Sequence, residues 1–184
     1  MGETTKKPSQ IWEWDDIQIQ TLPSNTEMTI YVQSHQTPLN CVYLKWRQKT
    51  SSQIRKLGDH WERAYGDLEW RGTVPERVMP RYFLTHDGQY THGYGVKTGA
   101  QSMCYWQMDT SGVSLYLDIR SGNQSVELGP EILEAATVIT RRGQIEESAF
   151  SAARAFSSLM CPHAILPPRP VYGGNNGYYT SADA

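Results

Sequence analysis

Apolar and polar residues alternate along much of the chain with a period of two, the pattern of strands that have one buried side and one solvent-facing side. The clearest case is residues 113–119, where the apolar positions are Val113, Leu115, Leu117 and Ile119. The same alternation, or a short run of β-branched and aromatic residues, predicts further strands over residues 17–21, 29–33, 41–46, 82–84, 90–96, 103–108 and 134–140.

A hairpin is predicted between residues 78 and 98. Asp87-Gly88 is a two-residue turn signal between its two strands. The returning strand carries Gly93 and Gly95, and Gly99 follows it. Glycine inside a strand indicates a bend or the close approach of another segment, so we expect one of these here.

One helix is predicted near the end of the chain. Ser148 suits its N-cap and Pro162 ends it. Its apolar stripe consists of Ala149, Phe150, Ala153, Phe156, Leu159 and Met160. A stiff proline-rich segment, residues 166–170, follows.

This order of elements predicts an all-β fold, an antiparallel β-sandwich with one C-terminal helix and a Pro-rich linker. We divide the chain into a disordered N-terminus (1–11), the sandwich (12–145), the helix (146–161) and a linker (162–184).

Composition and charge exclude several classes of function. The chain has 184 residues and a formal charge of −2, without the basic patch that nucleic-acid binding requires. It has neither a run of about 18 apolar residues, as a membrane span needs, nor a secretory signal. Cys41, Cys104 and Cys161 lack zinc-ligand spacing and are expected to be reduced, buried thiols. We therefore expect a cytoplasmic protein without metal or cofactor.

The stretch from Leu57 to Arg71, LGDHWERAYGDLEWR, combines carboxylates, arginines and large aromatic residues. Aromatic faces cover the C–H side of a sugar ring, and charged groups beside them bind pairs of hydroxyls. The stretch therefore predicts a sugar-binding loop whose candidate residues are Trp61, Glu62, Arg63, Tyr65, Asp67 and Trp70.

A structural interpretation of the stretch is favoured from composition alone. In it, Arg63 and Arg71 pair with Glu62, Asp67 or Glu69 and tie a long loop to a sheet. Catalysis is not favoured, although glycoside hydrolysis needs two carboxylates about 5–5.5 Å or about 6.5–9.5 Å apart and the stretch contains carboxylates.

A metal site is not favoured either. His60, His86 and His92 would meet only if the loop folded over the hairpin, and nothing in the sequence predicts that geometry.

Several motifs together resemble a known family. They are residues 57–71, VPERVMP at 74–80, THGYGVKTG at 91–99, LMCP at 159–162 and PVYGGNN at 170–176. These are similar to the N-terminal β-sandwich domain of bacterial α-galactosidase-like (melibiase-type) glycoside hydrolases, in the clan of retaining α-galactosidases. The resemblance covers residues 12–179. It implies a supersandwich-like domain that packs against a catalytic (β/α)₈ barrel, whose strands carry both catalytic aspartates.

The resemblance further implies that this chain stops where the first barrel strand begins, so that alone it hydrolyses nothing. In such enzymes a sandwich loop reaches the barrel mouth and helps to bind the terminal sugar, which fits the six candidate residues. The expected partners are galactosides or related oligosaccharides, the barrel of the parent protein, and other copies of this chain, but neither nucleic acid nor membranes. Two alternatives are a stand-alone carbohydrate-binding module that uses the same loop and a structural scaffold without a ligand.

Overall fold

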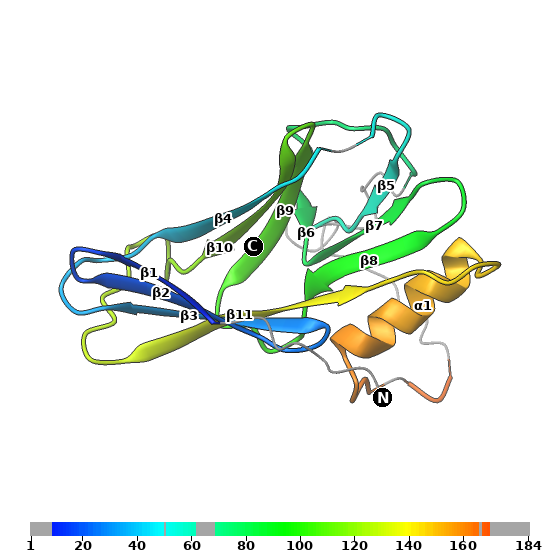
Figure 1. Ribbon diagram of the computed structural model, residues 1–184. Helices are drawn as coiled ribbons and strands as arrows, with labels where there is room; N and C mark the ends of the chain where they lie inside the picture. The colour runs from blue at the N-terminus through cyan, green and yellow to red at the C-terminus, as the bar shows by residue number, and fades with distance from the viewer. Residues whose placement is uncertain (1–8, 50, 62–68, 166, 170–184) are drawn as a thin grey trace, which may run out of the picture.

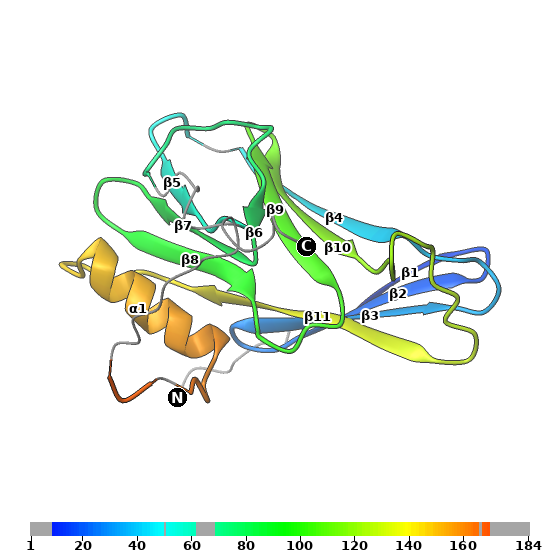
Figure 2. The ribbon, with the colours of Figure 1, turned by 180° about the vertical axis from the view of Figure 1, so that it is seen from behind.

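The computed structural model describes residues 9–49, 51–61, 69–165 and 167–169. Two antiparallel sheets face each other, and one helix lies on the outside (Figure 1). Figure 2 shows the same layers from behind, with the helix against the outer face of the larger sheet. The predicted all-β sandwich with a C-terminal helix is confirmed.

Seven strands form the larger sheet, in the order β1-β2-β3-β11-β8-β7-β5. Their bounds are β1 Gln10–Trp14, β2 Ile17–Pro23, β3 Glu27–Ser34, β11 Ile132–Arg141, β8 Thr91–Val96, β7 Tyr82–His86 and β5 Arg55–Gly58. The smaller sheet has the order β4-β10-β9-β6, with β4 Cys41–Arg47, β10 Gly112–Asp118, β9 Met103–Asp109 and β6 Met79–Pro80.

Each predicted strand overlaps an observed one, but β1, β5 and β6 were not predicted. Because β1 begins at Gln10, the sandwich starts two residues earlier than predicted, and Gln10 and Ile11 belong to a strand. The predicted barrel entry, residues 170–176, lies outside the described residues, as do residues 1–8 of the predicted disordered start.

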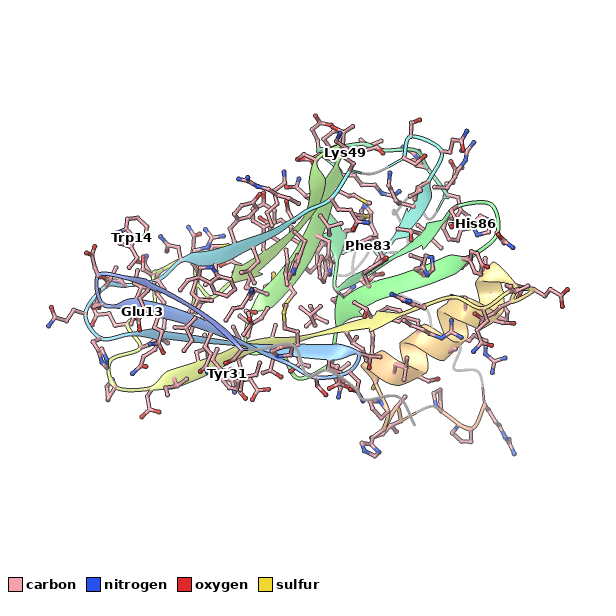
Figure 3. The ribbon with its side chains drawn as sticks, in the orientation of Figure 1. Glu13, Trp14, Tyr31, Lys49, Phe83 and His86 are labelled. Carbon is pink, nitrogen blue, oxygen red and sulfur yellow. The ribbon has the colours of Figure 1, made fainter. Side chains whose placement is uncertain are left out.

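The main core lies between the two sheets. Leu115 and Leu117 of β10 are fully buried there, as predicted, but Ser114 on the predicted solvent-facing side is buried as well. Phe83 of β7 points into the space between the sheets (Figure 3) and stacks on Tyr94, with ring centroids 5.1 Å apart. Trp106 of the smaller sheet packs edge-on against the Phe83 ring, with ring centroids 5.6 Å apart. Aromatic contacts therefore join the two sheets.

A second core lies between the larger sheet and the helix α1, Ala149–Met160, which is capped by Ser148 as predicted. Phe156 of α1 is fully buried against β8, where a Cβ atom added at Gly93 would lie 2.5 Å from its ring. The glycines of β8 therefore mark a close approach, one of the two predicted causes. The predicted stripe is partly wrong, because Phe150 is 71 % exposed and Leu159 is 42 % exposed.

The structure also bears on the predictions for the cysteines and for membrane-spanning helices. Cys104 is buried, but Cys41 is exposed and Cys161 is only partly covered, so the prediction of three buried thiols is wrong for these two. None of the helices in the described part of the chain is long and apolar enough to cross a membrane.

The close fit of α1 on β8 predicts the effect of adding one methyl group. Gly93→Ala should lower the free energy of unfolding by about 1–3 kcal/mol, because Phe156 must leave its position. Gly72→Ala is the matched control, since its Cβ would meet nothing within 4 Å, and it should stay within about 0.5 kcal/mol of the parent protein. Urea unfolding measures both, and equal effects of the two variants would contradict this packing.

Candidate functional site

The predicted sugar-binding loop starts and ends at the edge of the larger sheet. β5 is the last strand of that sheet and pairs with β7, with Leu57 opposite Leu84. Beyond the loop the chain returns beside β5, where Lys56 and Arg71 exchange two backbone hydrogen bonds of 2.8 and 3.0 Å. The two ends of the loop are thus held together on the sheet.

Basic side chains surround this closure. Lys56 is almost completely buried and donates its ammonium proton to Thr73 Oγ1, and burial lowers its pKa. Burial, and secondarily the charge of Arg71, lowers the pKa of Arg77, which donates to the Lys56 carbonyl at 3.4 Å. Arg71 also lies 3.9 Å from Glu69, one of the pairs expected from the structural interpretation, but both side chains are largely exposed and such a pair contributes little to stability.

An ion pair between a buried carboxylate and a half-exposed arginine holds the start of the loop. The side chain of Asp59 has no exposed surface, and its Oδ2 accepts from Arg81 Nε at 2.8 Å and lies 2.7 Å from Arg81 Nη2. Arg81 Nη2 also donates to the carbonyl of His60 at 3.3 Å. Asp59 donates its backbone N–H to the carbonyl of Tyr82 in β7 at 3.1 Å, so its backbone is held by β7 and its side chain by the residue before β7.

Arg81 lies at the corner where the chain passes from β6 of the smaller sheet to β7 of the larger sheet. Its φ of 60° is in the left-handed region, which is uncommon for a residue other than glycine. Its N–H donates to the Cys104 carbonyl in the smaller sheet, and its carbonyl accepts from Val96 N–H in the larger one. The same carbonyl accepts from Trp106 Nε1 at 3.1 Å. Sequence analysis missed this residue, since the only signal for it is the proline before it.

The two predicted aromatic residues that the structure describes lie at opposite ends of β7. Trp61 is 45 % exposed, and the Arg81 guanidinium lies 5.7 Å from its ring centroid. Trp70 packs edge-on against His86 at 5.9 Å and covers the second core. Arg81 and His86 are about 16 Å apart along an extended strand. A sugar ring on Trp61 would therefore find Arg81 beside it, and not Trp70.

Glu62, Arg63, Tyr65 and Asp67, the other candidate residues, lie outside the described residues. Their pairing with one another or with Arg71 therefore stays a prediction.

The described carboxylates and histidines of this region have structural partners. Asp59 is enclosed and bound by Arg81, which is the setting of a structural carboxylate. His86 hydrogen-bonds Thr91 at 3.0 Å, and His92 Nδ1 accepts from Gly143 N–H at 3.1 Å. Within the described segments, no three residues of the metal-binding types come together as ligands.

Two cavities lie elsewhere on the sandwich. One, of about 460 Å³, opens between the sheets and is lined mainly by apolar side chains, including Trp46, Tyr94 and Val113. The other, of about 500 Å³, lies at the end of the smaller sheet beside Tyr105 and has a polar lining. The sequence reveals neither cavity; for the second, the turn residues 121–123 are the feature that indicates it.

Comparison with known proteins finds no family model and no curated protein that matches this chain. Membership of the α-galactosidase-like family therefore stays a prediction based on the motifs quoted above.

The Asp59–Arg81 pair predicts an asymmetric response to mutation. Arg81→Gln should lower the free energy of unfolding by about 3–5 kcal/mol, because it removes the cationic partner of a carboxylate that has no exposed surface. Asp59→Asn should cost less, about 1–3 kcal/mol, since Arg81 is 47 % exposed and water can hydrate it. The double variant should be more stable than the sum of the single effects predicts.

Denaturant unfolding of the parent protein, the two single variants and the double variant measures these free energies. Arg55→Gln on β5 is the control for the loss of an exposed arginine. Additive single effects, or a control as destabilised as Arg81→Gln, would show that the pair does not hold the loop.

Proposed function

We propose that this chain is the non-catalytic N-terminal domain of a bacterial, cytoplasmic α-galactosidase-like glycoside hydrolase. It supports the catalytic barrel, and the loop of residues 59–71 contributes to the pocket for the terminal sugar. Galactosides or related oligosaccharides are the ligands. The proposal rests on the resembling motifs and on a fold that agrees with what they imply.

One observation carries the sugar-binding part of the proposal. The Arg81 guanidinium lies over one face of the Trp61 ring, and each of the two side chains is about half exposed. An aromatic ring and a guanidinium together can bind a sugar, because the C–H face of the sugar packs on the ring while its hydroxyl groups accept hydrogen bonds from the guanidinium. The buried carboxylate of Asp59 orients the guanidinium before any ligand arrives, which reduces the entropy lost on binding.

The gene beyond codon 184 tests the proposal directly. We expect an open frame that continues into a (β/α)₈ barrel, and we expect its complete product to release 4-nitrophenol from 4-nitrophenyl α-galactoside. The 184-residue chain alone should release none. A complete product without a barrel, or hydrolysis by the isolated chain, would refute the assignment.

Trp61→Ala tests the loop in that complete product. It should raise KM for the α-galactoside about 3–10-fold with kcat unchanged, because the ring contributes about 0.5–1.5 kcal/mol of binding. Trp14→Ala removes another exposed tryptophan, on β1, and should leave KM as it is. Figure 3 shows Trp14 at the end of the sandwich away from His86. If both variants have the parent KM, the loop does not take part in sugar binding.

Self-association belongs to the proposal, and the edge strand β1 supports it. Ile11, Trp12 and Trp14 are 52 %, 46 % and 76 % exposed, and β1 has no lysine or proline of the kind that protects an edge. Sedimentation of the 184-residue chain should show dimers that increase with concentration and decrease in Trp14→Lys. Phe150→Lys, which adds the same charge on α1, is the control, and an equal loss of dimers in both variants would exclude β1 as the contact.

A further inference from the structure

A row of three tyrosines crosses the outer face of the smaller sheet. Tyr43, Tyr116 and Tyr105 lie directly opposite one another on β4, β10 and β9. Their ring centroids are 4.9 and 4.6 Å apart, and the planes of the second pair differ by only 6°. Cross-strand aromatic contacts of this kind make the row rigid, because each ring restricts the rotamers of the next.

Two tyrosines of the row, Tyr105 and Tyr116, keep their hydroxyl protons at neutral pH. Burial raises the pKa of Tyr105 and of Tyr116 above the ordinary value, and neighbouring tyrosine, cysteine and aspartate side chains add to the shift. Tyr43 is 49 % exposed, and its hydroxyl lies 3.2 Å from Ser114 Oγ. Protonated phenols both donate and accept hydrogen bonds, as a partner rich in hydroxyl groups requires.

A polar pocket of about 500 Å³ adjoins the row at Tyr105. Its lining includes Asn40, Tyr105, Asp118, Arg120, Asn123 and Gln124. We call it the amide pocket, because three of these side chains are carboxamides. A carboxamide offers donors and an acceptor together, which matches the hydroxyl pairs of a sugar ring.

The amide pocket is organised without a ligand. Gly122 and Asn123 both have positive φ, 55° and 65°, and form the tight turn that Ser121 and Gln124 close with two backbone hydrogen bonds of 3.0 Å. Across the pocket, Ser125 donates to Asn40 Oδ1 at 2.8 Å. The walls are therefore held in place by the turn and by side-chain hydrogen bonds.

The charges in the amide pocket compensate each other. Arg120 donates to both carboxylate oxygens of Asp118, at 2.6 to 3.2 Å, and to Asn123 Oδ1 at 2.8 Å. The hydrogen bonds from Arg120 also lower the pKa of Asp118, so the pair stays ionised at neutral pH. No other lining residue of this pocket is a basic or carboxylic group. A phosphate or a metal cation would find its partner already occupied, whereas a neutral polyol can accept from the carboxamide NH₂ groups, which these hydrogen bonds do not use.

We propose that the amide pocket and the tyrosine row bind a neutral oligosaccharide. One sugar ring lies in the pocket beside Tyr105, and the rest of the saccharide follows the row, whose hydroxyls supply further hydrogen bonds. This site shares no residue with the loop of residues 59–71 and does not rest on the function proposed for that loop.

Side-chain amide resonances report on the pocket directly. In ¹H–¹⁵N spectra of the 184-residue chain, stachyose or cellotetraose should shift the NH₂ signals of Asn40, Asn123 and Gln124 with an apparent Kd of about 1 mM. Gln124→Ala, and Asn123→Gly, which keeps the left-handed turn, should each weaken this binding about tenfold. Gln89→Ala, in the exposed turn between β7 and β8, is the matched control and should bind like the parent chain.

The site is refuted if neither saccharide shifts these signals, or if Asn123→Gly and Gln124→Ala bind as well as Gln89→Ala. Inorganic phosphate that shifts the same signals as strongly as the saccharides would overturn the assignment to a neutral ligand. Trp61→Ala should leave the shifts unchanged, and their loss in that variant would assign the binding to the loop instead. Thermal unfolding of each variant confirms that the fold is retained.

Discussion

The ion pair between Asp59 and Arg81 and the corner at Arg81 stabilise each other. A left-handed backbone costs Arg81 roughly 1–2 kcal/mol, but it places the N–H of Arg81 on the smaller sheet and its carbonyl on the larger one. A carboxylate with no exposed surface requires a partner of opposite charge, and this corner supplies one. The chain can therefore change sheets here without leaving a buried polar group unpaired, and β5, β6 and β7 depend on this arrangement.

The corner also makes the structural and the sugar-binding interpretations of the loop compatible. The buried side of the Arg81 guanidinium binds Asp59, while its exposed side lies over the ring of Trp61. Asp59 and Trp70 are buried or packed on the sheet, as is Lys56 just before the stretch, and the Arg71–Glu69 pair is the one that the structural interpretation names among the described residues. Trp61 alone, among the described candidates, is positioned to meet a ligand. The stretch therefore contains residues that are packed on the sheet as well as an exposed tryptophan, and its composition alone does not distinguish the two kinds.

The sequence predicts strands well where each strand has one buried side. It predicts β10 because Leu115 and Leu117 alternate with polar residues, and α1 because Ser148 and Pro162 limit it. It fails for β1, where every residue is exposed, and for β5, where a lysine is buried. For the site, the sequence indicates Trp61 but not Arg81, since a non-glycine residue with positive φ has no clear signal. The amide pocket is missed because Asn40 and Gln124, which both line it, are far apart in the sequence.

The Arg81 corner connects the loop to the tyrosine row as well. Pro80, the residue before Arg81, lies opposite Tyr105 in the pairing of β6 with β9. The row therefore begins one residue from the corner and runs across the smaller sheet to Tyr43. Among the described elements, α1 packs on β8 and β11 at the outer face of the larger sheet and not on the smaller sheet, whose outer face carries the tyrosine row (Figures 1 and 2). Because Arg81 directly follows β6, a change at Arg81 that shifts this strand would move the residue that pairs with Tyr105, while the pairing of β9, β10 and β4 holds the rest of the row.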